Sequence, residues 1–400
     1  MNATVPYTYK SHFLGTHRAC TPEVTWNRIE PWLERFGVTR IAPVTGLDNV
    51  GISTVMAIRP ASRGLSVAQG KGIDEPSARV SGAMEAIEHA VAESVINDRL
   101  YGSVREIETR YCMPHMNRLA SCSSKFTNDI ELLWVNGVDL VTATNTLCPY
   151  ELVHLDLSLR ATPGAEYFEV TSNGLASGNS LIEATCHGLF EVVERDALCK
   201  FFALAGAEQE SRRVALDSVD DSTCRELLSR YSAAGVDVAI WDINSIIGLP
   251  VFMCDIVDGP AQAMRGLQRA RGSGCHSSRG IALTRALCEA AQARLTYIAG
   301  SRDDIVPDEL HRAREPNAIH RARQEIARIG TSKFERTPDL SFDSFDAELA
   351  WILERLDACG YQQVLRVVLR DEPDEPFAVT RIVVPGLGFS TSHNRQGCGS

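Results

Sequence analysis

One residue pattern occurs three times in this chain, and it constrains the fold more than any other feature. In each copy an alanine is followed three positions later by a polar residue, then by a glutamate four positions on, and then by a glutamate or glutamine three positions further. The copies are Ala78, Ser81, Glu85 and Glu88; Ala184, His187, Glu191 and Glu194; and Ala282, Arg285, Glu289 and Gln292. Residues three or four positions apart share one face of an α-helix, so each copy predicts a helix with a narrow polar stripe.

Each helix is expected to follow a glycine-rich turn. The three turn-forming stretches are AQGKGIDEPS, SNGLASGNS and RGSGCHSSRG, and the strand-like runs VGISTVMAI and AEYFEVTS precede the first two. The repeated unit is therefore strand, glycine-rich turn and helix. The copies are too far apart and too unevenly spaced for a solenoid. We expect three related corners of one globular domain.

The polar stripes are expected to line a cleft inside the protein. In the second copy Glu183 joins the stripe, while the rest of the segment from Leu181 to Leu198 is almost entirely apolar. A single acidic stripe is usually a solvated helix face, but three copies on otherwise apolar helices favour an internal cleft. Clustered carboxylates repel one another unless cations neutralise them. Mg²⁺ suits such oxygen ligands and commonly binds substrate phosphates as well, which suggests ATP.

A phosphate site in this chain cannot be a Walker A loop. The nearest stretch, from Gly64 to Lys71, has five intervening residues where four are required, and Gly72 follows the lysine. Positive charge near the stripes comes instead from Lys71, Arg79, Arg195 and Arg285. The glycine-rich turns also bring backbone N–H groups to helix N-termini, where phosphates bind readily.

Charge and composition exclude several classes of protein. The net charge of −11 argues against a sequence-independent nucleic-acid binder, so no nucleic-acid partner is expected. The sequence has neither a secretory signal nor an apolar run long enough for a membrane span, and we expect a cytoplasmic protein without a membrane partner. The twelve cysteines include no CxxC pair and are interpreted as reduced thiols.

The motifs together resemble the YcaO family. The resemblance runs through QGKGIDEPSARVSGAMEAIEH, SNGLASGNSLIEATCHGLFEVVERDAL, GSGCHSSRGIALTRALCEAAQAR and VVPGLG, with a shorter match in KSHFLGTHRACTPEVTW. The repeated units themselves favour an α/β (α+β) domain with mixed or antiparallel sheets flanked by helices, because QVLRVVLRD and FAVTRIVVPG are typical of a hairpin-like pair of strands. The expected division is an N-terminal segment at 1–62 that contributes to the nucleotide site, the YcaO domain at 63–389, and a flexible tail at 390–400.

The resemblance also implies ATP and Mg²⁺ as cofactors, and it assigns site residues by motif position. The expected nucleotide-binding residues are Lys10, Thr16, Lys71, Ser81, Glu85, Glu88, Asn179, Glu183, Glu191, Glu194, Arg195, Arg285 and Glu289. The expected metal ligands are Glu85, Glu88, Glu183, Glu191, Glu194 and Glu289, and the residues assigned to catalysis are Glu191, Glu194 and Arg195. His187, His276 and Cys398 receive no role.

The activity that the resemblance implies is phosphorylation of a backbone amide oxygen in a peptide or protein. A side-chain nucleophile of the substrate would give an azoline, and external sulfide would give a thioamide. Azoline-forming members usually end in a proline-rich segment, whereas PGLGFSTSHNRQGCGS has no proline after Pro385, which favours thioamide formation with a TfuA-type partner. A separate peptide-recognition partner and a homodimer are also compatible with the family. The alternatives are an azoline-forming cyclodehydratase, a non-catalytic nucleotide- or peptide-binding scaffold, and a methylthiotransferase accessory factor.

Overall fold

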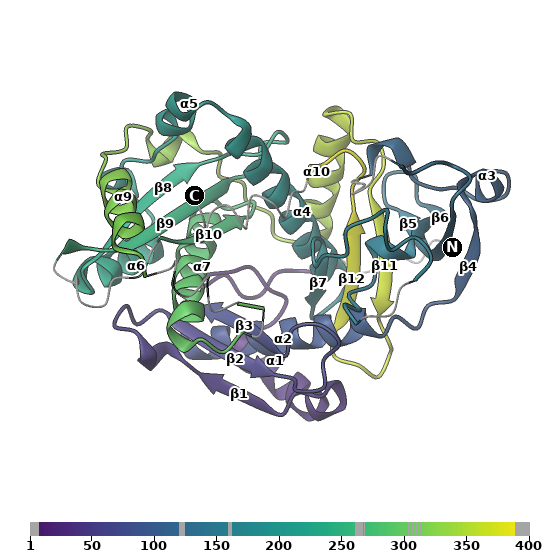
Figure 1. Cartoon of the computed structure of the whole chain (residues 1–400), viewed down its shortest axis with the longest axis horizontal. Coiled ribbons are helices and arrows are strands. Elements are labelled where there is room, and N and C mark those ends of the chain that lie inside the picture. The colour runs from purple at the N-terminus through teal and green to yellow at the C-terminus, as the bar shows by residue number, and fades with distance from the viewer. Residues whose placement is uncertain are drawn as a thin grey trace.

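The computed structural model describes residues 8–388, apart from residues 120–124, 159–161, 261–266, 268, 303, 306–307, 309–310 and 312–313. Its strands form three antiparallel sheets (Figure 1). The first has the order β1 (Arg40–Pro43), β2 (Ser53–Ile58), β3 (Val67–Gly72), and the second has the order β10 (Ala270–Cys275), β9 (Val251–Asp258), β8 (Val236–Asp242). The third runs β4 (Arg99–Ser103), β5 (Glu131–Asp139), β11 (Leu365–Arg370), β12 (Ala378–Val383), β7 (Leu175–Gly178), with β6 (Thr144–Pro149) paired to β5. The expected α/β class with antiparallel sheets is confirmed, as is the hairpin-like pairing of β11 with β12.

Three long helices follow one strand of each sheet and converge on the centre of the molecule (Figure 1). They are α2 (Glu75–Glu93) after β3, α4 (Leu181–Ala203) after β7, and α7 (Arg279–Ala299) after β10. We call these three strand and helix pairs the first, second and third corners. The remaining helices with described bounds are α1 (Pro22–Ile29), α3 (Val104–Ile107), α5 (Gly206–Ser211), α6 (Ser222–Ala233), α9 (Pro316–Ile326) and α10 (Phe345–Ala358).

The glycine-rich stretches before these helices are themselves strands, which differs from the expected turns. β7 lies inside its stretch, and β3 and β10 each begin one residue before theirs and run into it. The strand-like run AEYFEVTS forms turns and irregular structure instead. The reason is close packing of each helix on its own strand. A Cβ on Gly70 would lie 2.1 Å from the Ala78 carbonyl oxygen, and one on Gly272 would lie 2.3 Å from the Ala286 carbonyl oxygen. Glycine is therefore required by the approach of the helix.

Local sequence fixes where two of the helices begin. The Asp74 side chain accepts a hydrogen bond from the Ser77 N–H at the start of α2, and Ser180 does the same for the Glu183 N–H at the start of α4. Such caps satisfy backbone donors that have no partner within the helix. Away from its stripe, α4 buries apolar residues such as Leu189 against the neighbouring sheets. Burial of this apolar surface orients the polar stripe toward the centre of the molecule.

The last stripe position of each central helix hydrogen-bonds to the strand of the next corner. Glu88 accepts from the Ser177 N–H (2.8 Å) and hydroxyl (2.5 Å) of β7; Glu194 accepts from the Cys275 N–H (2.9 Å) and the Ser273 hydroxyl (2.6 Å) of β10; and the Gln292 amide donates to the Gln69 carbonyl of β3 (2.8 Å). The first corner thus binds the second, the second binds the third, and the third binds the first. This closed ring fixes the three stripes relative to one another.

Two further features bear on the expected organisation. The boundary expected at residues 62 and 63 lies between β2 and β3, which pair along their length in one sheet. The expected tail at 390–400, including Cys398, lies outside the described residues.

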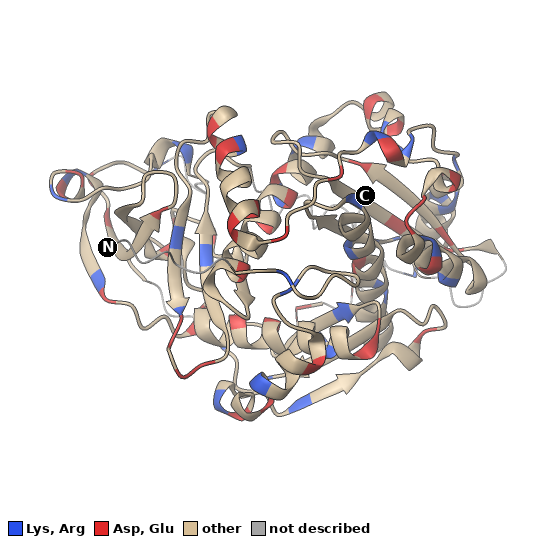
Figure 2. Ribbon diagram, turned by 180° about the vertical axis from the view of Figure 1, so that it is seen from behind, with Lys and Arg blue, Asp and Glu red and all other residues tan. Residues whose placement is uncertain are grey.

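Acidic and basic residues are interspersed over the ribbon seen from behind (Figure 2). No helix within the described residues combines the length and the apolar character needed to cross a membrane.

Candidate nucleotide and metal site

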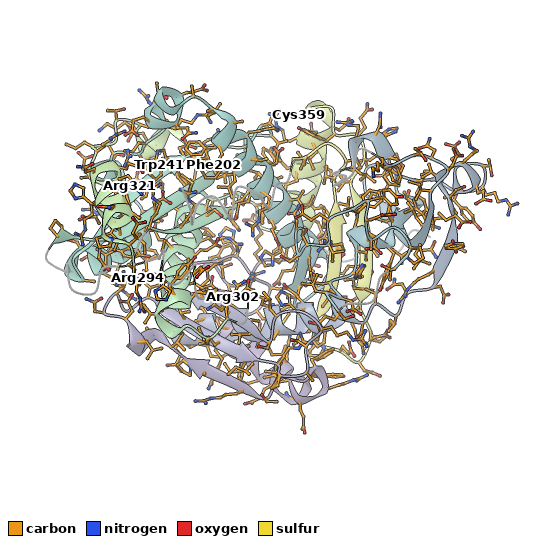
Figure 3. All side chains as sticks on the ribbon, in the orientation of Figure 1. Phe202, Trp241, Arg294, Arg302, Arg321 and Cys359 are labelled. Atoms are coloured by element: carbon orange, nitrogen blue, oxygen red, sulfur yellow. The ribbon has the colours of Figure 1, made fainter. Side chains whose placement is uncertain are left out.

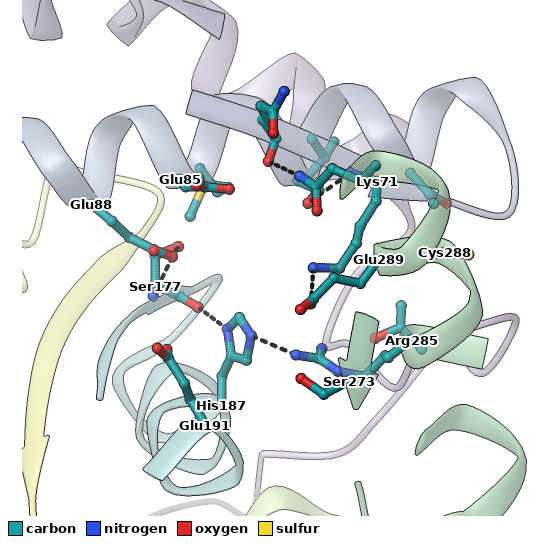
Figure 4. A pocket seen from close by; sticks show the side chains of 18 of the residues that line it. Lys71, Glu85, Glu88, Ser177, His187, Glu191, Ser273, Arg285, Cys288 and Glu289 are labelled. Atoms are coloured by element: carbon teal, nitrogen blue, oxygen red, sulfur yellow. Dashed lines mark hydrogen bonds and ion pairs between the residues drawn. The ribbon is translucent and has the colours of Figure 1, made fainter. Parts of the chain in front are cut away.

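The three stripes face a single cavity of about 680 Å³ (Figure 4). The predicted residues that line it are Thr16, Lys71, Ser81, Glu85, Glu88, Asn179, Glu183, Glu191, Glu194, Arg195, Arg285 and Glu289. The residues around Thr16 come from the N-terminal loop, whereas the others come from the three corners. Residues more than 270 positions apart in the chain therefore converge on the same space.

Glu85, Glu88 and Glu191 form what we call the carboxylate cluster. Burial raises the pKa of Glu85 to about 7, that of Glu88 to about 8 and that of Glu191 to about 7. The charges of Glu85 and Glu191 raise the pKa of Glu88 further, against the hydrogen bonds from Ser177. Among the described residues, Glu85 and Glu88 have no ion-pair partner, and Glu191 has only Arg195 at 4.0 Å. The carboxyl groups of the cluster keep protons near neutral pH that a bound cation could displace.

This chemistry fits Mg²⁺. The cluster offers carboxylate oxygens on two helices around one cavity, and a divalent cation prefers such oxygen ligands while keeping some positions for water or phosphate. Burial raises these pKa values by disfavouring the charged carboxylates, so a cation there would stabilise the charged forms and offset the repulsion that Glu85 and Glu191 exert on Glu88. Of the predicted metal ligands, Glu85, Glu88 and Glu191 are thus the ones best placed to bind a cation, Glu88 through the oxygen that does not accept from Ser177.

The other predicted metal ligands already have partners. Lys71 Nζ lies 2.7 Å from Glu289. Burial alone would raise the pKa of Glu289, but the positive charges of Lys71, Arg195 and Arg285 bring that pKa below its usual value. Glu194 uses both oxygens in the ring of hydrogen bonds. These two carboxylates lie beside the cluster but are held by the protein itself.

Glu183 connects the N-terminal loop to the start of α4. It accepts hydrogen bonds from Arg18 Nη1 at 3.3 Å, from the Ala19 N–H at 3.0 Å and from Asn179 Nδ2 at 3.1 Å. Its side chain is only 2% exposed. Glu183 and Asn179 therefore fix the loop that carries Thr16 and Arg18 over the cavity.

Lys10 does not line the cavity, which differs from the expectation. Its ammonium lies 2.8 Å from Glu348 on α10, with both side chains fully buried. His17, His276 and Glu348 bring possible ligand atoms within 4.8 Å of one another here. However, His276 Nδ1 accepts the Ser278 N–H at 3.0 Å, so the neutral ring keeps its proton on Nε2. With Lys10 already neutralising Glu348, this group is a buried polar network rather than a metal site.

Arg285 is suited to binding an anion. Its Nε atom is buried and has no hydrogen-bond partner within the described residues. No ion pair to Arg285 is found in that part of the chain either. A buried guanidinium group with an unsatisfied donor beside a cavity fits a phosphate oxygen. Lys71 lies near Glu289 beside Arg285 (Figure 4), and the charges of Lys71 and Arg195 both lower the pKa of Glu289.

Two residues at the cavity, Ser177 and Arg302, were not predicted from the sequence. Ser177 lies in the stretch expected to be a turn, yet it binds Glu88. Arg302, beyond the end of α7, also lines the cavity but lies outside all three repeated motifs (Figure 3). Ser177 occupies the position seven residues before the repeated alanine, where the first corner has Lys71, and this correspondence could have identified it. Arg294, in the third motif, instead lies in ion pairs with Asp48 and Asp258, each at 2.8 Å.

Comparison with known proteins finds relatives over most of the chain. The model of a family described as YcaO cyclodehydratase, ATP- and Mg²⁺-binding, matches residues 69–388. An uncharacterized protein in the tfuA 3′ region of Rhizobium leguminosarum bv. trifolii is 34% identical, over 94% of this chain and 89% of its own length. An uncharacterized Methanothermobacter thermautotrophicus protein is 32% identical, over 95% of this chain and 97% of its own. The expected cofactors ATP and Mg²⁺ match the family description.

Solved structures share the fold. YcaO from Methanopyrus kandleri, bound with AMPPCP and Mg²⁺, aligns with a TM-score of 0.73 at 23% identity over 95% of both chains. A heterocyclase in complex with substrate and cofactor aligns with a TM-score of 0.79 at 20% identity, covering 96% of this chain. This chain spans about half, 54%, of that heterocyclase.

Proposed function

The chain belongs to the YcaO family, and on that premise we propose that it activates a backbone amide of a peptide or protein by ATP- and Mg²⁺-dependent O-phosphorylation, giving a thioamide with a TfuA-type partner. The observation that carries the proposal is the carboxylate cluster facing Arg285 and Lys71 across one cavity. Negative groups for a cation and positive groups for phosphate lie where one metal-bound nucleotide could use both.

The proposed chemistry needs a better leaving group than an amide oxygen. Phosphoryl transfer from ATP supplies it once a nucleophile has added to the amide carbonyl. The residues of the chain bind and orient the reactants: Glu85, Glu88 and Glu191 hold the cation, and Arg285 and Lys71 bind phosphate oxygens. Charge that builds up on the transferred group is then met by groups already in position. Arg195 remains proposed as a catalytic residue through its place beside Glu191.

Glu194 has a different proposed role from the one its motif position implies. Both of its oxygens accept hydrogen bonds from β10, so it positions the third corner and supports the site without binding the metal directly. Glu183 is likewise proposed to hold the N-terminal loop. Thr16, Ser81 and Asn179 line the nucleotide cavity and stay in the proposed binding set. Lys10 belongs to that set only if its ion pair with Glu348 opens when nucleotide binds.

The thioamide product is supported by the position of the Rhizobium relative in the tfuA 3′ region. The azoline alternative is supported by the family description, YcaO cyclodehydratase. The heterocyclase among the structural neighbours, at 20% identity, shows the fold alone. The two products differ in composition: sulfur replaces oxygen in a thioamide, and one water is lost in an azoline.

The test combines the purified chain, ATP, Mg²⁺, radiolabelled sulfide and a TfuA-type protein with a peptide extract of the source cells. Sulfur incorporation into peptide that requires ATP and both proteins supports the thioamide proposal. Peptide dehydration without sulfide would favour the azoline. ATP binding without any ATP consumption would favour the scaffold alternative. The matched control replaces the chain with its Glu191→Gln variant.

A further inference from the structure

His187 lies between the carboxylate cluster and Arg285 (Figure 4). It occupies the polar stripe position of the second corner, which Ser81 and Arg285 occupy in the first and third. Ser81 acts within its own corner, where its hydroxyl accepts the Lys71 N–H at 3.3 Å. His187 instead reaches from α4 to the side chain of α7.

The two contacts of His187 select one form of its ring. Nδ1 lies 3.5 Å from the Ser177 carbonyl oxygen, and Nε2 lies 3.4 Å from Arg285 Nη2. A carbonyl oxygen only accepts hydrogen bonds, and a guanidinium group only donates them. Both contacts are therefore satisfied by a neutral ring with its proton on Nδ1. A charged ring would turn a second donor and a like charge toward Arg285.

The surroundings favour that neutral ring. Burial lowers the pKa of His187 well below its usual value, and Arg18, Arg285 and Lys71 lower it further. The hydrogen bond to the Ser177 carbonyl acts in the opposite direction but does not reverse the shift. His187 therefore presents a lone pair to Arg285 across the physiological pH range.

A neutral partner has a particular consequence for Arg285. A carboxylate at this place would neutralise the guanidinium group, as Asp255 does for Arg271 at 2.7 Å. His187 instead fixes the guanidinium group through one N–H and leaves its charge available, while Nε remains buried without a partner among the described residues. An anion in the cavity then meets a cation that is already oriented.

We propose that His187 is a positioning residue that holds Arg285 toward a phosphate oxygen of the bound nucleotide. The assignment rests on the proposed function. Ser177 completes the arrangement, because its carbonyl fixes the ring tautomer of His187 while its N–H and hydroxyl bind Glu88. One residue of β7 thereby connects the carboxylate cluster with the arginine.

The test is ATP binding by calorimetry in the presence of Mg²⁺, on wild type, His187→Ala, His187→Gln, Arg285→Gln and the double variant His187→Ala with Arg285→Gln. Glutamine retains an acceptor that can reach Arg285 and serves as the matched control. We expect His187→Ala to weaken binding about tenfold, as for a lost hydrogen bond to a charged group, and His187→Gln to restore most of it. The double variant should bind no more weakly than Arg285→Gln alone.

Thermal unfolding of each variant shows whether any loss reflects folding instead of positioning. Two results would overturn the role of His187 but not the proposed nucleotide site. One is an ATP affinity that His187→Ala leaves at the wild-type value, and the other is a loss of affinity in the double variant that equals the sum of the two single losses. A fully folded His187→Gln variant that binds as weakly as His187→Ala would also overturn it, since the acceptor would then have no role. Wild type that binds no ATP with Mg²⁺ overturns the proposed nucleotide site and this assignment with it.

Discussion

Lys71 on β3 donates to Glu289 on α7 across 2.7 Å, so the first and third corners meet in one ion pair at the wall of the cavity. The two side chains are 23% and 27% exposed. In the proposed complex Lys71 exchanges this carboxylate for a phosphate oxygen. The ion pair with Glu289 therefore holds the Lys71 ammonium group at the cavity wall until nucleotide binds.

Replacing Lys71 with glutamine should weaken ATP binding while changing the stability of the folded protein little. A partly solvated ion pair contributes about 0–1 kcal/mol to the free energy of unfolding, so the melting temperature should change little. Loss of a charged donor to phosphate should weaken ATP binding about tenfold or more. Calorimetry and thermal unfolding measure the two effects. Arg105→Gln, which removes an exposed ion pair to Asp129 far from the cavity, serves as the control and should change neither.

Two glutamates three positions apart on α4 should respond in opposite directions to the same substitution. The pKa of the Glu191 carboxyl group is raised to about 7, so without metal its ionisation at pH 8 destabilises the folded protein. Glu191→Gln removes this charge and should be more stable than wild type by about 1–2 kcal/mol at pH 8, after allowance for solvent screening in the cavity. Glu194→Gln replaces two hydrogen bonds to a charged carboxylate with weaker hydrogen bonds to a neutral amide and should cost about 1–3 kcal/mol. Denaturant unfolding of both variants checks the signs. Equal signs would mean that the two residues share one role.

Stabilisation by Mg²⁺ should grow with pH. The carboxyl groups of the cluster have folded-state pKa values of about 7 to 8, above the ordinary value of 4.5, so the folded protein binds more protons than the unfolded chain in this window. Their contribution to stability is complete below pH 4.5 and is lost as the pH rises to about 8. Mg²⁺ binds the deprotonated groups and offsets that loss. Melting temperatures with and without Mg²⁺ should differ more at pH 8 than at pH 6, and an equal difference at both would contradict the cluster as a metal site.

Close packing of α2 on β3 can be tested at Gly70. A Cβ at this position would lie 2.1 Å from both the Ala78 carbonyl oxygen and the Gly82 nitrogen, which are backbone atoms that cannot rotate away. Gly70→Ala should therefore lower the free energy of unfolding by about 1–3 kcal/mol and weaken Mg²⁺ binding through displacement of Glu85. Gly46→Ala, where a Cβ meets no atom within 4 Å, is the matched control. An unaffected Gly70→Ala variant would show that the helix is free to move outward.

Much of the site could be predicted because its signal is local. The stripe spacing defines helix faces within a dozen residues, and so Glu85, Glu191 and Glu289 were placed correctly on α2, α4 and α7 facing the cavity. The glycine-rich strands were missed because their glycines are selected by the approach of a helix and not by β propensity. Lys10 illustrates a second limit. Its partner Glu348 lies on α10, and no local pattern predicts a pairing across more than 330 positions.

The sequence also does not predict which stripe residues hydrogen-bond to other parts of the protein and which remain available for a ligand. Glu88, Glu194 and Gln292 occupy one motif position, yet they hydrogen-bond to three different strands. Their partners belong to other corners, so the ring becomes visible only once the corners are assembled. The same holds for Ser177, whose backbone contacts both Glu88 and His187.

Calorimetric titration of ATP with and without Mg²⁺ on wild type and Glu191→Gln tests the carboxylate cluster most directly. We predict that wild type binds ATP tightly only with Mg²⁺, and that Glu191→Gln loses this metal dependence while remaining folded. Binding of ATP that is equally strong with and without Mg²⁺, or that Glu191→Gln leaves intact, would contradict the carboxylate cluster as the metal site.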